Sequence, residues 1–281
     1  MKIQLGFDLT YACADATPMI LMLNVHPSRA ADLLKPDRLH FTPPRSITPY
    51  VDGFGNKCVR VLAPAGELRV TSSTVIADSG RPDPIDLGAQ EHAVANLPHD
   101  TLAYLLASRY CETDLMMDKA WELFGSAAAG WRRVQAICDF VHQHIAFGYP
   151  YADATRTAAR AFAERRGVCR DFTHLAVTFC RCLNIPARYC TGYLGDIGVP
   201  PDPAPMDFSA WFEAFVGGRW FTFDARHNAP RIGRVLIARG RDAADVAIST
   251  TFGANVLKSF NVTTYEAEGH SAAAGERTMV A

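Results

Sequence analysis

The run from Gly167 to Leu183 is the segment that most constrains the fold of this chain. From Phe172 onward its apolar residues recur every three or four positions, which predicts a helix with one buried face. Pro186 disfavours helical conformation at the residue before it, so the helix must end ahead of that proline. Gly167 is suited to ending the preceding segment, because glycine costs least at the C-terminal cap of a helix. The pattern therefore predicts a buried helix whose first turn contains Cys169.

The position of Cys169 suggests a chemical role. A thiol at a helix N-terminus lies at the positive end of the helix dipole and ionises more easily than a free cysteine. The neighbouring cation Arg170 would favour the anion further. A small buried core residue is the ordinary alternative for a cysteine in such a chain. We interpret Cys169 as a nucleophile and expect it to be the fastest-reacting of the eight cysteines.

The composition is that of a globular protein and excludes several classes of function. Of 281 residues, 49% are hydrophobic, and the net charge of −1 gives no general attraction to nucleic acid or anionic membrane. No apolar run reaches the length of a membrane span, and the N-terminus lacks the apolar segment of a signal peptide. The cysteines follow no disulfide framework, so we expect reduced thiols in a cytoplasm. No glycine-rich phosphate loop or metal-ligand cluster occurs, and we expect neither cofactor nor metal.

The chain divides by pattern into a β-rich part and a mixed part. Alternating strands separated by turn residues fill the beginning, which predicts an all-β, sandwich-like domain over residues 1–80. The proline-rich segment 79–84 marks a boundary. Helical and strand patterns then alternate over residues 81–265, and the weakly hydrophobic tail 266–281 is expected to fray.

A hairpin is predicted around the pair Gly217-Gly218, which is typical of a two-residue turn. Such a turn pairs 216 with 219, 213 with 222 and 211 with 224. Because opposed residues share a face, four side chains should project from the same side of the hairpin, and these are Ser209, Trp211, Glu213 and Asp224. The proline-rich loop 196–207 before it either walls a cleft or simply crosses the surface.

These features together resemble the transglutaminase-like superfamily, which includes transglutaminases and related cysteine proteases. The resemblance covers roughly residues 130 to 230 and rests on the runs Gly167-Val168-Cys169-Arg170-Asp171-Phe172, Ile185-Pro186-Ala187-Arg188-Tyr189 with Gly192-Tyr193, Ala210-Trp211-Phe212-Glu213, and Gly218-Arg219-Trp220-Phe221-Thr222-Phe223-Asp224. It implies an α+β fold with a papain-like core, in which the nucleophile helix packs on an antiparallel sheet behind an N-terminal β domain. It further implies Cys169 as nucleophile, Asp224 as the carboxylate that orients a histidine, and Trp211 as a substrate-binding residue.

The chain departs from the family pattern at the histidine. Ser209 occupies that position, and a serine cannot take a proton from a thiol at neutral pH. His227, three residues after Asp224, is the candidate replacement if the chain breaks near Asn228 and turns back. A polar strand-end residue is an equally good interpretation of His227. His174, His142 and His144 are weaker candidates, because their helical positions place them away from the thiol.

Two classes of function remain open on this sequence. The first is a cysteine-nucleophile amide hydrolase or acyltransferase that acts on peptide or glutamine amides through a thioester. The second is a catalytically silent peptide-binding or scaffolding module, because Ser209 replaces the family histidine. A redox-responsive thiol protein is a third, weaker interpretation. The basic residues Arg231, Arg234, Arg239 and Arg241 fit either a substrate carboxylate or a solvated edge. Nothing in the sequence sets the oligomeric state.

Overall fold

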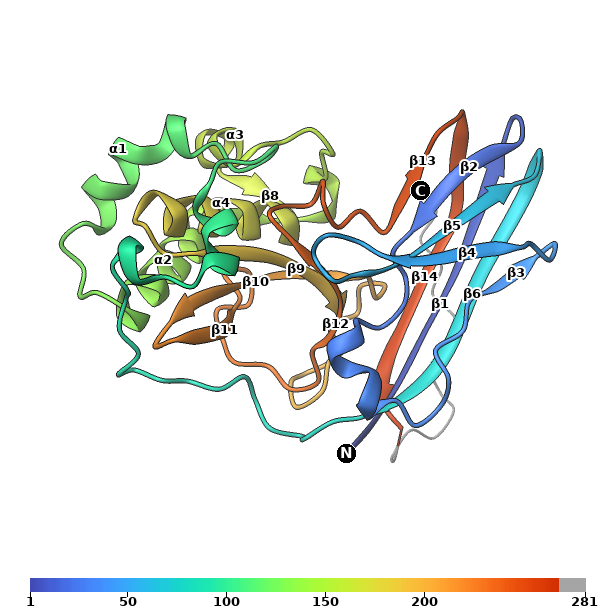
Figure 1. Cartoon of the computed structure of the whole chain (residues 1–281), viewed down its shortest axis with the longest axis horizontal. Helices are drawn as coiled ribbons and strands as arrows, with labels where there is room; N and C mark the ends of the chain where they lie inside the picture. Colours follow the sequence, from blue (N-terminus) through green and yellow to red (C-terminus); the bar gives the residue numbers. More distant parts are fainter. Residues whose placement is uncertain (268–281) are drawn as a thin grey trace.

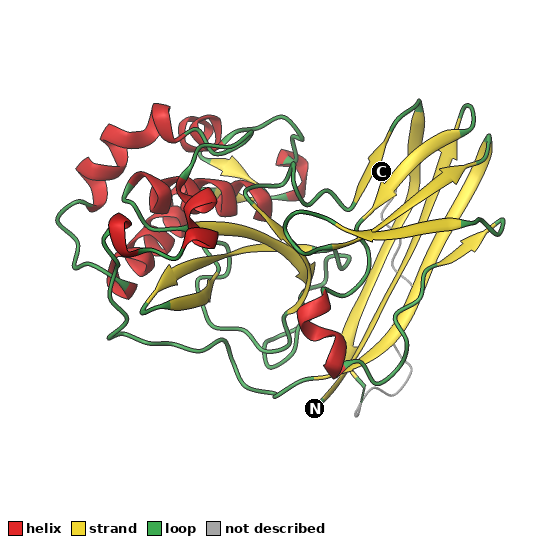
Figure 2. Cartoon of the chain, in the orientation of Figure 1, coloured by secondary structure: helices red, strands yellow, loops and turns green. Residues whose placement is uncertain are grey.

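A computed structural model describes residues 1–267 of the chain, so the tail predicted to fray lies outside the described residues from 268 onward. A helix-rich half lies beside a half built of long strands, as Figures 1 and 2 show. Most strands pair antiparallel, and helices pack on the central sheet of the first half. The predicted α+β class is therefore confirmed. Within residues 1–267, no helix is both long and apolar enough to cross a bilayer.

The β half is a pair of packed sheets with a shared apolar interior. Over the described residues, their strand orders are β14-β1-β6-β3 and β13-β2-β5-β4. The strands are β1 (Lys2–Cys13), β2 (Thr17–Leu21), β3 (His40–Thr42), β4 (Ile47–Val51), β5 (Lys57–Ala63), β6 (Gly66–Ala77), β13 (Ser249–Thr251) and β14 (Asn255–Glu266). Along β1 every second side chain is buried, because alternate residues of a strand face opposite sides.

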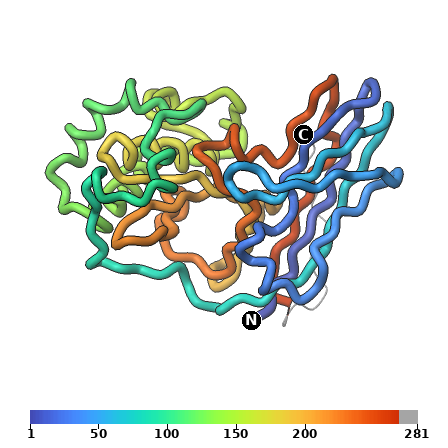
Figure 3. The backbone as a smooth tube through the Cα atoms, viewed as in Figure 1, coloured from blue at the N-terminus to red at the C-terminus, as the bar shows by residue number. Residues whose placement is uncertain are grey.

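Strands from the end of the chain complete this β half, which corrects the predicted domain division. β14 pairs antiparallel with β1 along nearly its whole length, and β13 pairs with β2. In Figure 3 the red C-terminal strand runs beside the blue N-terminal one. The assignment of residues 249–265 to the second unit is wrong, because these strands fill the edge positions next to β1 and β2. The β half is thus made from both ends of the described chain.

The other half contains the helices and the sheet β11-β10-β9-β12. Its elements are α1 (Thr113–Phe124), α2 (Trp131–His144), α3 (Ala158–Glu164), α4 (Cys169–Cys182), β9 (Ala187–Tyr193), β10 (Ser209–Val216), β11 (Arg219–Phe223) and β12 (Val235–Gly240). A short parallel pair, β7 (Ala146–Phe147) and β8 (Arg166–Gly167), precedes α4. Short 3₁₀ turns cover Pro27–Asp32, Val94–Asn96, His99–Leu105 and Tyr149–Tyr151. The helix α4 is surrounded by the other helices and by the strands β9 and β10, so the core forms around it.

The predicted hairpin register is confirmed in the part that forms a ladder. Val216 pairs with Arg219 and Glu213 with Thr222. Gly217 and Gly218 have φ of 59° and 77°, a conformation that two-residue hairpin turns require and that glycine adopts without strain. The ladder ends at Phe223, so the expected pairing of 211 with 224 lies beyond it.

The connection between the two halves generates the first prediction. Residues 78–98 run over the surface almost without regular structure, and most are exposed. We expect limited proteolysis to cleave within this segment, because exposed irregular backbone is readily cut. The two fragments should still elute together from a sizing column, since β14 of one fragment pairs with β1 of the other. Native separation of the fragments, or cleavage between 170 and 225 first, would contradict this arrangement.

Candidate active site

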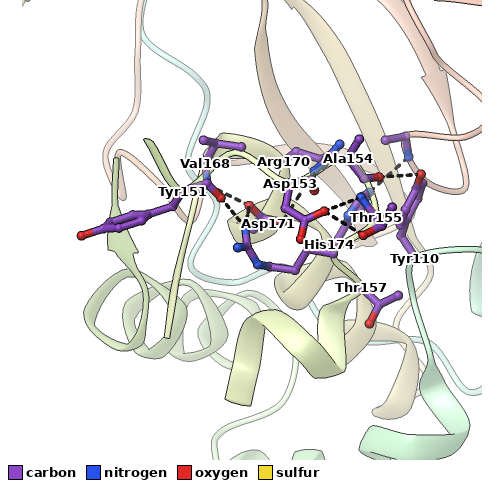
Figure 4. Close-up of polar contacts among 12 residues, drawn as sticks. Tyr110, Tyr151, Asp153, Ala154, Thr155, Thr157, Val168, Arg170, Asp171 and His174 are labelled. Atoms are coloured by element: carbon purple, nitrogen blue, oxygen red, sulfur yellow. Dashed lines mark hydrogen bonds and ion pairs between the residues drawn. The ribbon is translucent and has the colours of Figure 1, made fainter. Parts of the chain in front are cut away.

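The N-terminus of α4 is fixed by a buried carboxylate three residues inside the helix. The Val168 N–H donates to Asp171 Oδ2 at 2.8 Å, and the Arg156 guanidinium donates to the same oxygen at 3.2 Å. Arg156 and Asp171 are both buried. Figure 4 shows Val168, Asp171 and the neighbouring Asp153 loop gathered at this helix end. A paired carboxylate in the first turn satisfies free N–H groups and suits the helix dipole, so Cys169 is held at a fixed helix start.

Gly167 has a different role from the one predicted. The left-handed residue that ends α3 is Arg165, with φ of 53°. At Gly167 a Cβ atom would lie only 2.4 Å from Asp171 Oδ2. Glycine is therefore required here because the carboxylate that fixes α4 packs directly against its Cα. The prediction that Gly167 caps the preceding helix is wrong.

A cleft of about 160 Å³ opens at this helix end. Its walls include three of the residues predicted for the site, namely Cys169, Ser209 and His227. The loop 196–207 forms one wall through Asp196, Asp202 and the residues up to Asp207. The loop therefore does not merely cross the surface. The fold brings a thiol, an imidazole and several carboxylates together around one opening.

Asp224 organises His227 through a tight turn. The N–H groups of Arg226 and His227 both donate to Asp224 Oδ1, at 2.9 and 3.0 Å. The His227 ring nitrogen Nδ1 lies 2.8 Å from Asp224 Oδ2. The strand ends at Phe223 and the chain turns back, as required for a side chain three residues later to reach the carboxylate. The predicted return of His227 to Asp224 is confirmed by this geometry.

The charge state of Asp224 fixes the tautomer of His227. Burial alone would raise the pKa of Asp224, but the guanidinium of Arg234 and the bonds from His227 outweigh it and hold that pKa well below its ordinary value. Arg234 Nη2 lies 2.8 Å from Asp224 Oδ2. An ionised carboxylate only accepts hydrogen bonds, so Nδ1 of His227 must carry the proton. The unprotonated Nε2 of a neutral His227 is then available to accept a proton.

Cys169 is not the easily ionised thiol that the sequence suggested. Burial, together with the carboxylate of Asp207, raises the pKa of the Cys169 thiol to about 11. Arg226 and the backbone N–H of Ala210 act in the opposite direction without overcoming burial. Arg170 does not stabilise the thiolate, because its guanidinium donates to the Asp153 carbonyl and lies over the Tyr110 ring. The expectation that Arg170 favours the anion is wrong, and the resting thiol needs a base.

Asp207 is a site residue that the sequence analysis missed. It lines the cleft, and burial raises its pKa to about 6, although the Phe208 N–H and Arg226 lower it. A carboxyl group with such a pKa exchanges protons near neutral pH. A signal was present in the chain, since Asp207 is an acidic residue at the end of the proline-rich loop, two residues before Ser209.

The structure places Trp211 outside the cleft. The residue is 3% exposed, the Arg234 guanidinium lies 5.2 Å from its ring centre, and it lines a different cavity together with Arg234. Trp211 therefore does not line the Cys169 cleft, and its predicted contact with substrate stays a prediction. Glu213 is engaged by Arg188 on the neighbouring strand.

The remaining candidate histidines have structural contacts. His174 is fully buried, stacks on Tyr110 and accepts the Ala243 N–H at Nε2. Burial and two neighbouring cations lower the pKa of His174 well below its ordinary value, so it stays neutral. His142 bonds the Arg226 carbonyl and His144 the Phe162 carbonyl. None of these three lines the cleft among the described residues.

The chain is similar to known proteins in sequence and in fold. A sequence model described as the transglutaminase-like superfamily matches residues 120–225, which include Cys169 and Asp224. A solved structure titled "a Putative Cysteine Protease from Cytophaga hutchinsonii" is 30% identical, with a TM-score of 0.82 over 97% of this chain and 92% of that one. The chain belongs to the transglutaminase-like superfamily.

Neither the family match nor the sequence relative assigns a role to each residue of the cleft. The family match ends at residue 225, so His227 lies beyond it and gains no support from that match. The uncharacterized protein ML0607 of Mycobacterium leprae is 34% identical over 90 residues, and this match covers 31% of the present chain and 32% of that protein. The role of each cleft residue must therefore be argued from this protein's own geometry.

The pKa values of Cys169 and Asp207 lead to a prediction for this transglutaminase-like protein. Replacing Asp207 by Asn should speed alkylation of Cys169 by iodoacetamide at pH 8 by about three- to tenfold, because a repelling charge is removed from the thiolate. The carboxyl of Asp207 ionises as pH rises through about 6, so the variant and the parent should react alike below pH 5 and diverge above pH 6.

Asp202→Asn serves as the control, since Asp202 is exposed on the same loop. Peptide-mapped mass spectrometry over a pH series provides the rates. Slower alkylation in Asp207→Asn than in the control would mean that Asp207 assists the thiol, and the repulsion argument would fail.

Proposed function

We propose that this protein is a cysteine-nucleophile amidase, which transfers the acyl group of a peptide or glutamine amide to water or to an amine through a thioester on Cys169. The observation that carries the proposal is the bonded pair Asp224–His227 at the same cleft as a thiol on a helix N-terminus. A nucleophile, a base and a carboxylate that orients the base constitute the minimal unit for this chemistry. The substrate is a peptide or a protein side chain.

The proposed reaction begins with a proton transfer. His227 takes the thiol proton at Nε2, and the Cys169 sulfur attacks the amide carbonyl to give a tetrahedral intermediate. The protonated imidazole then gives its proton to the leaving amine or ammonia as the C–N bond breaks. Asp224 stabilises the imidazolium through the Nδ1 bond and remains ionised. Water or an amine next attacks the thioester, loses a proton to His227 and releases Cys169.

Backbone donors near the sulfur support an oxyanion position. Cys169 is the first residue of α4, and an N–H there has no acceptor within the helix. The backbone N–H of Ala210 also lowers the pKa of Cys169 and so favours its anion. Donors fixed by α4 and by the start of β10 are pre-oriented, which is the condition for stabilising a developing oxyanion.

The high pKa of the thiol determines what the base must do. With a thiol pKa of about 11, almost all of the protein at neutral pH carries a protonated Cys169. Attack therefore requires proton removal during the reaction, unlike in enzymes that hold a preformed thiolate and imidazolium. His227 suits this role through its orientation by Asp224, and Asp207, with a pKa of about 6, is the competing base.

A second function is favoured by specific observations at the same cleft. Ser209 occupies the family's histidine position, and within residues 1–267 no hydrogen bond joins the Cys169 sulfur to His227. A cleft whose thiol is protonated and has no bonded base would suit a catalytically silent peptide-binding module. The two functions differ in one measurable property, which is turnover dependent on His227.

A comparison of variants tests the proposal. His227→Gln should lower turnover by about 10²-fold or more, since glutamine can still donate to Asp224 but cannot accept the thiol proton. Ser209→His should add little, because the base is already supplied. Ammonia release, amine incorporation and peptide cleavage from glutamine-containing peptides are measured in parallel, which also distinguishes hydrolysis from transfer.

His40→Ala is the control, since His40 is an exposed residue of β3 in the other half. Cys169→Ser should be inactive on every substrate. If Asp207→Asn abolishes turnover while His227→Gln retains it, Asp207 is the base. If the parent is silent and Ser209→His creates activity, the protein is a binding module and the proposed catalysis is wrong.

A further inference from the structure

A second cavity is lined in part by Arg234, the partner of Asp224, and shares Arg231 with the Cys169 cleft. Its volume is about 290 Å³, and we call it the rear cavity. Its lining comes from four parts of the chain, which are the hairpin β10–β11, the residues from Arg231 to Arg239 around β12, the turn Pro27–Asp32 and the connecting segment 78–84. The space exceeds that of a few water molecules, at about 30 Å³ each, and suits a small polar molecule.

The lining of the rear cavity carries more positive than negative charge. Its basic residues are Arg29, Arg81, Arg231, Arg234 and Arg239, and its acidic residues are Asp78, Asp83 and Glu213. Each of these carboxylates is already engaged, with Asp78 bound by Arg29, Asp83 by Arg234, and Glu213 by Arg188 from outside the lining. In the part of the chain that the structure describes, neither Arg81 nor Arg239 has a carboxylate partner.

Buried guanidinium atoms in this lining lack acceptors. Over residues 1–267, Nη1 of Arg234 and Nε of Arg231 are enclosed and have no hydrogen-bond partner, although both residues are more than nine-tenths buried. Buried polar groups are almost always paired, so such atoms indicate an acceptor that the protein chain does not itself supply. Burial and the neighbouring Arg234 lower the pKa of Arg231, which agrees with an excess of positive charge.

A nearby histidine responds to the same charge. His26 lies two residues before Ser28 of the lining, and burial together with Arg239 and Arg188 lowers the pKa of His26 to about 4. The imidazole is therefore neutral at physiological pH and does not add to the cluster. The positive charge of the rear cavity comes from arginines, which remain protonated at any physiological pH.

We propose that the rear cavity is a binding site for a small oxyanion of the phosphate class, held by Arg231, Arg234 and Arg239. A tetrahedral oxyanion presents several acceptors at once and pairs with the forked donors of arginine, which a single carboxylate does less completely. Nη1 is the guanidinium nitrogen of Arg234 that lacks a partner, because Nε and Nη2 already bind Asp83 and Asp224. The proposal does not rest on the proposed catalysis, since neither Cys169 nor His227 lines the rear cavity, although Arg231 lines both spaces.

Calorimetric titration of the full chain tests the site. Inorganic phosphate, glycerol 3-phosphate and acetate are titrated at constant ionic strength, so that general screening is the same in every experiment. Phosphate should bind saturably, and Arg239→Gln should weaken binding by about tenfold or more, as expected for loss of a charge-assisted contact. Arg132→Gln, an exposed substitution on α2, should leave affinity unchanged. The Cys169→Ala variant should bind as the parent does, which separates this test from that of catalysis.

The outcomes distinguish free phosphate from the phosphate group of a larger molecule, and they include results that would contradict the site. Tighter binding of glycerol 3-phosphate than of inorganic phosphate identifies the phosphate group of a larger molecule, and the reverse order identifies free phosphate. If Arg239→Gln fails to fold by circular dichroism, Arg81→Gln replaces it and should also weaken phosphate binding, because Arg81 is the other lining arginine without a carboxylate partner and is exposed. Absence of saturable binding to the parent, or equal loss in Arg132→Gln, overturns the proposal and leaves the rear cavity as a solvated ion-pair network.

Discussion

The Asp224 carboxylate is the interaction on which the rest of the candidate site depends. One oxygen accepts two backbone N–H groups and thereby forms the turn that brings His227 back, and the other binds the His227 ring and Arg234. Arg234 also binds Asp83 in the segment that connects the two halves. Burial would favour the neutral acid, but these contacts reverse it and hold the pKa of Asp224 well below its ordinary value. A neutral Asp224 would weaken the turn after Phe223, the bond that fixes the tautomer of His227, and the ion pair with Arg234.

Local sequence rules predicted the elements that carry this site, and non-local contacts account for what they missed. The apolar period marked α4, and Gly217-Gly218 fixed the hairpin register through its two positive φ angles. The place of β14 beside β1 could not be predicted, because it joins residues from opposite ends of the chain. The reason for Gly167 was equally hidden, since it depends on where Asp171 packs.

Electrostatics was the least predictable part of the site. The helix dipole and Arg170 suggested an acidic thiol, yet Arg170 points toward Asp153, and burial beside Asp207 makes Cys169 a weak acid with a pKa of about 11. Charges that are neighbours in sequence need not face each other, and desolvation depends on the complete fold. The position that the resemblance assigns to a histidine holds Ser209, and His227 instead reaches Asp224 through the turn that follows Phe223.

The central claim is that His227 is the residue that exchanges protons with Cys169. The most direct measurement is a crystal structure of the protein with Cys169 covalently modified by a peptidyl chloromethyl ketone, which occupies the cleft as an acyl group would. We expect His227 Nε2 to lie within about 3–4 Å of the Cys169 sulfur, with Nδ1 still bound to Asp224. An adduct in which the Asp207 carboxyl or Ser209 contacts the sulfur, and His227 lies beyond reach of it, would contradict the account.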